Sequence, residues 1–256
     1  MVRLATWNVN SLKVRLAQLL DWLGRERPDV VCLQETKTED ANFPAMEIER
    51  AGYRALFSGQ RLYNGVAILA RVLPSDPFRL LPGFADEQKR VLAATVDGMR
   101  IVCVYVPNGE SVESDKYCYK LAWLAALRQW LEQELQRHPQ LALLGDYNVA
   151  PEDRDVHDPR LWQGRVLFSE PERAAFRSLL DLGFRDSFRL FEQPDRSFSW
   201  WDYRMNAFRR NLGLRIDHIL LSDGLAQRAC ASWIDKTARA VDRPSDHAPV
   251  ITELGT

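Results

Sequence analysis

Short apolar runs, each about the length of a β-strand, recur from one end of the chain to the other and constrain its fold more than any other feature. Several are apolar at nearly every position, which is typical of strands covered on both faces. The runs are Arg3–Trp7, Asp29–Gln34, Gly65–Ala70, Val91–Val96, Arg100–Val106, Leu141–Gly145, Arg215–Leu221 and Ala248–Glu253. The sequence therefore predicts β-sheets that are buried inside the molecule.

Two longer stretches between these runs carry leucines at helical spacing. Ser11–Arg25 and Lys116–Arg137 each place an apolar stripe along one face, and Pro28 and Pro139 follow them as helix terminators. No linker-like tract and no fixed-period repeat divides the 256 residues. We therefore predict a single α/β domain over residues 1–256 (α+β by some schemes), built of stacked sheets with helices outside.

Composition narrows the class of protein. Apolar residues make up 46% and charged residues 27%, which excludes a disordered chain. No run approaches the ~18 apolar residues of a membrane span, and MVRLATWNVNS does not resemble a signal peptide. The 4 cysteines form no C-x-x-C pair, and Cys32 and Cys103 lie in apolar runs. These features favour a cytoplasmic protein with buried thiols and no membrane association.

The overall charge does not by itself indicate a nucleic-acid partner. Lys and Arg number 34 against 35 Asp and Glu, which leaves a net charge of −1. A protein of this composition that binds a polyanion must gather its basic residues on one face.

Polar residues recur where the apolar runs end. They form the segments WNVN at 7–10, LQETK at 33–37, YVPNG at 105–109, GDYN at 145–148, RIDH at 215–218 and PSDHAP at 244–249. Any one of them could be a turn or a surface charge. Together they indicate a site, because loops at strand ends are where rigid scaffolds place reactive groups.

The residue types favour metal-assisted hydrolysis of a phosphodiester. Carboxylates at Glu35, Asp146 and Asp246 and amide oxygens at Asn8 and Asn148 are hard ligands that suit Mg²⁺ or Mn²⁺. Zinc would favour a set of His and Cys ligands, and the 4 histidines show no H-x-x-x-H spacing. The P-loop, the G-x-S-x-G and G-x-G-x-x-G motifs and the H-E-x-x-H motif do not occur.

These segments resemble the exonuclease III family of abasic-site DNA endonucleases, within the endonuclease/exonuclease/phosphatase superfamily. FSWWDYR at 198–204, NLGLRIDHIL at 211–220 and RPSDHAPV at 243–250 complete the resemblance, which runs in order from about residue 1 to 254. It implies a deoxyribonuclease I-like fold, a four-layer sandwich of two mixed β-sheets packed face to face. The WWDYR and LGLRID segments are typical of the DNA-repair branch.

The resemblance also implies roles for individual residues. Glu35 and Asn8 would bind the metal, with support from Asp246, and Asp146 and Asn148 would orient the attacking water and could also bind the ion. His247, which could also bind the metal, would contact the scissile phosphate as a cation or as a base, oriented by Asp217. Tyr105 and Asn108 would donate to phosphate oxygens. Asn10 stands where some relatives carry an acid, which favours one metal ion over two.

Substrate binding is expected around an aromatic cluster late in the chain. Trp200, Leu214 and Ile216 would form an apolar pocket for a flipped-out baseless sugar, while Phe198 and Trp201 are expected in the core. Basic residues occur here and elsewhere, and a subset of them should contact phosphates; they are Lys13, Arg15, Lys116, Lys120, Arg204, Arg209, Arg210 and Arg215. The stretch between Pro151 and Pro171 shows no periodicity and is predicted to be a loop that forms a pocket wall.

The sequence thus predicts a Mg²⁺-dependent phosphodiesterase, with Mn²⁺ as a substitute, that cleaves duplex DNA 5′ to abasic sites and removes 3′ nucleotides or 3′ blocking groups. One alternative is mainly a 3′-5′ exonuclease or 3′-phosphodiesterase with weak activity at abasic sites. Others are a sugar or lipid phosphatase of the same superfamily and a DNA-binding module without catalysis. A monomer with no obligate protein partner is the simplest expectation.

Overall fold

Two six-stranded β-sheets form the centre of the computed structural model, which describes residues 1–255. The first sheet runs in the order β11 (Ala229–Ile234), β12 (Val250–Leu254), β1 (Val2–Asn8), β2 (Val30–Gln34), β4 (Val66–Ala70), β3 (Arg54–Ser58). The second runs β5 (Ser75–Phe78), β6 (Val91–Val96), β7 (Met99–Tyr105), β8 (Leu141–Asp146), β10 (Asp217–Ser222), β9 (Phe184–Asp186). Both are mixed, because β1 with β2 and β7 with β8 are the parallel pairs in otherwise antiparallel sheets.

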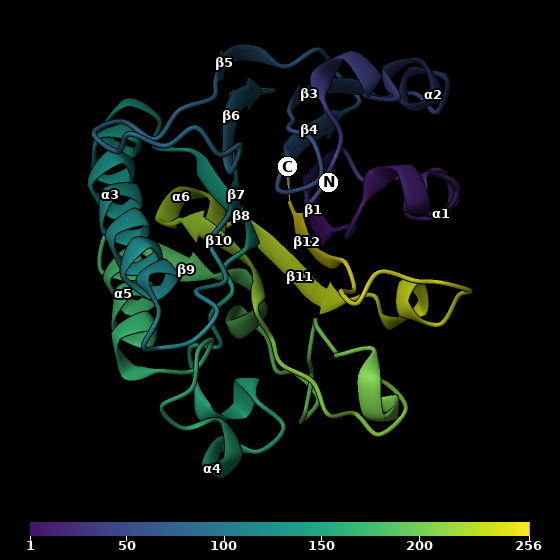
Figure 1. Ribbon diagram of the computed structural model, residues 1–256. Helices are drawn as coiled ribbons and strands as arrows, with labels where there is room; N and C mark the ends of the chain where they lie inside the picture. Colours follow the sequence, from purple (N-terminus) through teal and green to yellow (C-terminus); the bar gives the residue numbers. More distant parts are fainter. Residues whose placement is uncertain (256) are drawn as a thin grey trace.

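Helices cover the outer faces of the two sheets (Figure 1). The α-helices are α1 (Leu12–Glu26), α2 (Ala45–Arg50), α3 (Asp115–Arg137), α4 (Pro159–Trp162), α5 (Glu170–Leu180) and α6 (Asp223–Ala226). Short 3₁₀ turns lie at Asp40–Asn42, Asp153–Asp155, Ser187–Leu190, Arg204–Asn206 and Lys236–Arg239. Within residues 1–255, no helix is both long and apolar enough to cross a membrane.

The apolar core is layered as the predicted sandwich requires. Side chains from facing strands of both sheets, such as Cys32, Ile68, Ile101 and Leu144, share one cluster between the sheets. A second cluster joins the other face of the second sheet to α3 and α5, and a third joins the first sheet to α1 and α2. The prediction of two mixed sheets face to face with helices outside is therefore confirmed.

The predicted strands match the central strands of both sheets, and the predicted helices match α1 and α3. Four strands lack a counterpart among the predictions, and each is an edge strand: β3, β5, β9 and β11. The stretch predicted as a loop contains the short helix α4, and α5 begins immediately before Pro171. All four cysteines are free, and Cys32 and Cys103 are buried as predicted.

Strand register brings the polar strand ends together at one end of the sandwich. Asn8 pairs with Gln34 across the parallel strands β1 and β2, and Asp146 lies between Tyr105 on β7 and Asp217 on β10. Because β1 also contacts β8 across the interface, the ends of the two sheets meet.

Gly145 precedes Asp146 in β8 and allows β7 to approach closely. A Cβ atom at this position would lie 2.0 Å from the carbonyl oxygen of Val104. We therefore expect Gly145→Ala to lower the free energy of unfolding by about 3 kcal/mol, as overpacked core positions do. Urea unfolding followed by circular dichroism measures this. Gly24→Ala is the matched control, because Gly24 lies within α1 with no atom near its missing Cβ, so alanine should stabilise the helix.

Candidate active site

Three side chains from separate strand ends converge on one point. Glu35 follows β2, Asp146 ends β8 and His247 precedes β12, and one ligand atom from each lies within 4.8 Å of the others. Asn8 at the end of β1 joins the two carboxylates, because its amide nitrogen donates to Glu35 Oε1 at 2.8 Å and to Asp146 Oδ2 at 2.9 Å. The site therefore spans both sheets.

The backbone around this cluster is held in an uncommon conformation. Glu35, Asn148 and Asn10 have φ values of 50°, 49° and 43°, in the left-handed region that non-glycine residues rarely adopt. The amide of Ser11 donates to the carbonyl of Glu35 at 2.8 Å and so fixes this turn. Such strain persists where the surrounding structure enforces it, and it concentrates at functional sites.

His247 forms a buried ion pair with Asp217. Its Nδ1 lies 2.9 Å from Asp217 Oδ2, and the hydroxyl of Ser199 donates to the same oxygen at 2.7 Å. Burial lowers the pKa of His247, but the carboxylates of Asp217 and Asp146 outweigh it and raise this pKa to about 10. Without a bound cation, His247 is therefore held as an imidazolium at neutral pH. Its Nε2 lies 3.7 Å from Asp146 Oδ2.

The carboxyl group of Asp146 has a raised pKa. Burial raises its pKa to about 7, and Asp217 adds to this, although His247 and the hydrogen bond from Asn8 act in the opposite direction. Two carboxylates, Glu35 and Asp146, thus lie within 4.8 Å of each other. Their oxygens are the ligands that a hard divalent cation binds, so the cluster fits such an ion.

Hydrogen-bond donors surround the carboxylates. Burial first, and then the charges of Glu35 and Asp146, raise the pKa of Tyr105, which therefore stays a protonated donor. Asn108 donates its side-chain amide to Asn148 Oδ1 at 3.1 Å, and the backbone amide of Asn148 donates to Asp146 Oδ1 at 2.9 Å. These residues line the side of the site formed by the second sheet.

Asp246 lies beside the cluster of Glu35, Asp146 and His247. Its two oxygens accept from Asn10 Nδ2 and from the indole of Trp200, both at 2.9 Å. Lys37 pairs with Glu35, because its ammonium lies 2.8 Å from Glu35 Oε2 and 2.7 Å from Asn10 Oδ1. An acidic residue at position 10 would place another carboxylate near Glu35. In this chain the amide of Asn10 and the ammonium of Lys37 occupy that place.

The predicted apolar pocket residues belong to one cluster. Leu214 and Ile216 are buried, at 0% and 1% exposure, against Val156 and Leu167, while Trp200 is partly exposed. Antiparallel bridges run from Val156 to Leu214, from Leu214 to Trp200 and from Trp200 to His247. The segment between Pro151 and Pro171 thus forms a wall beside Leu214, and a continuous backbone ladder joins it to the imidazole.

The basic residues predicted to contact phosphate divide into two groups. Lys116 and Arg204 are exposed and pair with Glu110 at 2.9 Å and Asp202 at 2.5 Å. Lys120 and Arg215 do not belong to the predicted subset that contacts phosphate, because both are buried. Lys120 pairs with Glu172, and Arg215 pairs with Asp155 and Asp186. For Lys120 the sequence held a signal of burial that the prediction did not use, because the residue lies at helical spacing with Tyr117, Leu124 and Leu127 on one face of α3.

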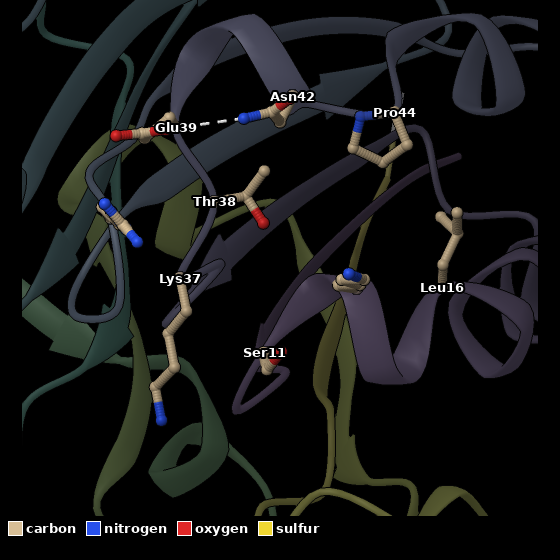
Figure 2. Close-up of a pocket in the computed structure, with 9 residues that line it drawn as sticks. Ser11, Leu16, Lys37, Thr38, Glu39, Asn42 and Pro44 are labelled. Carbon is tan, nitrogen blue, oxygen red and sulfur yellow. Dashed lines mark hydrogen bonds between the residues drawn. The ribbon is translucent and has the colours of Figure 1, made fainter.

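A cleft of about 570 Å³ adjoins the cluster through Lys37 (Figure 2). Ser11 at the start of α1 and Lys37 lie on one side of it, and Glu39, Asn42 and Pro44 lie across from them. Lys13 and Arg61 also line it. Three of its lining residues are cations and one is an acid, so the cleft carries a net positive charge. It reaches the cluster of Glu35, Asp146 and His247 at Lys37, which pairs with Glu35.

The sequence interpretation did not identify Ser199, which orients Asp217, or Lys37 as the partner of Glu35. Lys37 lies two residues after Glu35 in the LQETK segment, so its proximity could have been inferred. Ser199 lies in FSWWDYR, and its contact with Asp217 depends on the pairing of Ser199 and Trp200 with Leu214. That pairing leaves no signal in local sequence.

Comparison with known proteins places this geometry in a family. The model of the endonuclease/exonuclease/phosphatase family matches residues 5–247. Exodeoxyribonuclease III of Haemophilus influenzae is 36% identical over 99% of this chain and 100% of its own. Among solved structures, the 3′ phosphatase NExo from Neisseria bound to a product DNA hairpin has a TM-score of 0.98 at 45% identity, and an AP endonuclease from Archaeoglobus fulgidus has 0.96 at 37%, each with complete coverage of both chains.

The His247–Asp217 pair should make stability depend on pH. A pKa raised in the folded state contributes stability that is complete below the unfolded value of ~6.5 and is lost as pH rises through about 10. In metal-free buffer, we expect Asp217→Asn to cost roughly 3 kcal/mol below pH 6.5. That cost should shrink steadily toward pH 10, as measured by urea unfolding.

His138→Ala serves as the control, because His138 lies before β8, at the end of that strand away from the cluster. Its effect on stability should not follow the same pH course. A cost of Asp217→Asn that stays constant from pH 6 to 10 would show that His247 is not held as a cation.

Proposed function

The chain belongs to the endonuclease/exonuclease/phosphatase family and is of the exonuclease III type, and we propose that it is a Mg²⁺-dependent DNA-repair nuclease that cleaves 5′ to abasic sites and trims 3′ ends. The observation that carries this proposal is the meeting of Glu35, Asp146 and an imidazolium at His247. Glu35 and Asp146 offer carboxylates for a metal cation, and His247 adds a positive charge beside them. This combination suits a substrate that is an anionic phosphodiester.

Each residue has a distinct task in this mechanism. Glu35 and Asp146 would hold the ion, with Mn²⁺ as a possible substitute, and the bound cation would neutralise charge on the phosphate. Asp146 would accept a proton from the attacking water that Asn148 helps to orient. His247, held by Asp217, stabilises the charge that develops on the phosphate oxygens. Tyr105 and Asn108 donate to the same oxygens.

Several further properties form part of the proposal. Lys13, Lys37 and Arg61 in the cleft beside Glu35 support a path for the DNA backbone. Pairing of β1 with β12 joins the two ends of the chain, which supports a single domain over residues 1–256. The free cysteines suit a cytoplasmic location. A monomer without an obligate partner remains the simplest assignment.

One comparison favours 3′-end processing as the main activity, because the 3′ phosphatase NExo is 45% identical to this chain and the AP endonuclease from Archaeoglobus fulgidus is 37% identical. Product mapping on an abasic duplex beside a matched 3′-phosphate duplex and a 3′-recessed duplex separates the two activities. Incision faster on the abasic duplex supports the endonuclease, and turnover confined to 3′ ends supports the alternative.

Removal of the metal or of either key side chain should abolish most of the activity. We expect EDTA to stop cleavage, and Glu35→Ala and His247→Ala each to lower kcat by roughly 10²–10⁴, because each removes charge stabilisation or a proton-transfer group. Single-turnover cleavage of an end-labelled duplex measures this. His138→Ala should leave the rate unchanged.

Equal cleavage with Mg²⁺ and with EDTA would contradict the proposal, as would near-normal turnover by either variant. Release of phosphate from inositol phosphates but not from DNA would indicate a phosphatase. Tight duplex binding without cleavage in Mg²⁺ or Mn²⁺ would indicate a binding module.

A further inference from the structure

Lys120 on α3 is completely buried at 0% exposure, yet its ammonium has a partner for each of its three donors. The ammonium donates to the carbonyl oxygen of Asn108 at 3.0 Å, to that of Asn148 at 2.6 Å and to Glu172 Oε1 at 2.5 Å. A buried cation thus joins two turns of the active site to α5.

The two carbonyls belong to the turns that carry active-site amides. The Asn108 side chain donates to Asn148 Oδ1 at 3.1 Å, and Asn148 N donates to Asp146 Oδ1 at 2.9 Å. The stem of Lys120 also fills the space beside the first turn, since a Cβ on Gly109 would lie 3.1 Å from Lys120 Cδ. The position of Asp146 is therefore linked to one ammonium through two hydrogen-bonded turns.

Glu172 extends this connection to the pocket wall. Its carboxylate accepts from the backbone amides of Leu167 and Ser169 at 3.0 Å each and from the Ser169 hydroxyl. Leu167 belongs to the apolar cluster with Leu214, and its carbonyl accepts from the amide of Ala150 at 2.8 Å. The Lys120–Glu172 pair therefore contacts both the catalytic turns and the wall.

Stability alone does not account for a charge pair at this position. Taking two charges out of water is costly, and apolar replacements of buried pairs are often neutral or stabilising. Lys120 lies on the buried stripe of α3 with Tyr117, Leu124 and Leu127, where apolar side chains pack. What an apolar side chain at 120 could not supply is a shared donor for two carbonyl oxygens.

We propose that Lys120 is a positioning residue that fixes the backbone of Asn108 and Asn148 relative to Asp146, and that Glu172 holds the ammonium in place. Lys120 touches no substrate in this role and acts through the two asparagines. The inference rests on the proposed nuclease function, because it concerns the orientation of groups at that same site.

The test replaces Lys120 with a neutral side chain of similar length. In Lys120→Met, kcat for duplex cleavage should fall at least tenfold and approach ~10²-fold, since a misplacement of about 1 Å can cost that much. KM should change by less than threefold, because the surface that contacts DNA is untouched. Steady-state and single-turnover rates on the same duplex separate these quantities.

A second variant separates positioning from stability. Lys120→Met leaves Glu172 as an unpaired buried charge, whereas the double variant Lys120→Met/Glu172→Gln removes that charge. We expect the double variant to recover most of the lost Tm and to retain the low kcat. Recovery of kcat to within threefold of wild type, together with Tm, would overturn the proposal.

Arg100→Met is the matched control, because Arg100 forms another buried pair, with Glu134 at 3.0 Å, and lies near the start of β7, away from Tyr105 at its end. It should lower Tm but leave kcat within threefold, and a fall in kcat equal to that of Lys120→Met would also overturn the proposal. Wild-type protein that fails to cleave DNA in Mg²⁺ would refute the nuclease function itself. Active wild type with equally active Lys120→Met would refute only the positioning role.

Discussion

The structure depends on one amide that two acids share across two sheets. Asn8 ends β1 in the first sheet and donates to Glu35 from the same sheet and to Asp146 from the other. Carboxylates at this distance in a buried place repel each other, and only donors and cations make the arrangement stable. Lys37 and the imidazolium of His247 supply positive charge on either side. At this end of the sandwich, hydrogen bonds and ion pairs thus join the two sheets, and elsewhere apolar side chains pack between them.

The central strands could be predicted from sequence and the edge strands could not, for one physical reason. A strand such as β2 or β8 is covered on both faces, so nearly every residue is apolar and the run is unmistakable. Edge strands are short or half-exposed, as in β9 and β11, and their mixed patterns match those of loops. Helix α5 had a signal, because Ser169 and Glu172 form a capping box next to a proline.

Some parts of the candidate site could likewise be predicted from sequence, and others could not. Glu35, Asp146 and His247 could be placed together because each follows or precedes a strand, and strand ends of a sandwich meet at its edges. The partners of the buried cations Lys120 and Arg215 could not be placed, although Lys120 lies on the apolar stripe of α3. Their surroundings are set by segments far away in the chain, such as Glu172 and Asp155. Local pattern therefore identifies the chemistry, and tertiary contacts decide which charges serve it.

The backbone ladder from Val156 through Leu214 and Trp200 to His247 has a consequence for how such an enzyme can diversify. Leu214 and Trp200, which would contact the substrate, and His247, which would act on the phosphate, lie on adjacent β-bridges. A substitution that moves the backbone at Trp200 would act directly on the backbone of its bridge partner, His247. Substrate selectivity and catalytic rate would therefore change together at Trp200, whereas a new substrate range would arise more readily through the outer wall at Val156, three bridges away from His247.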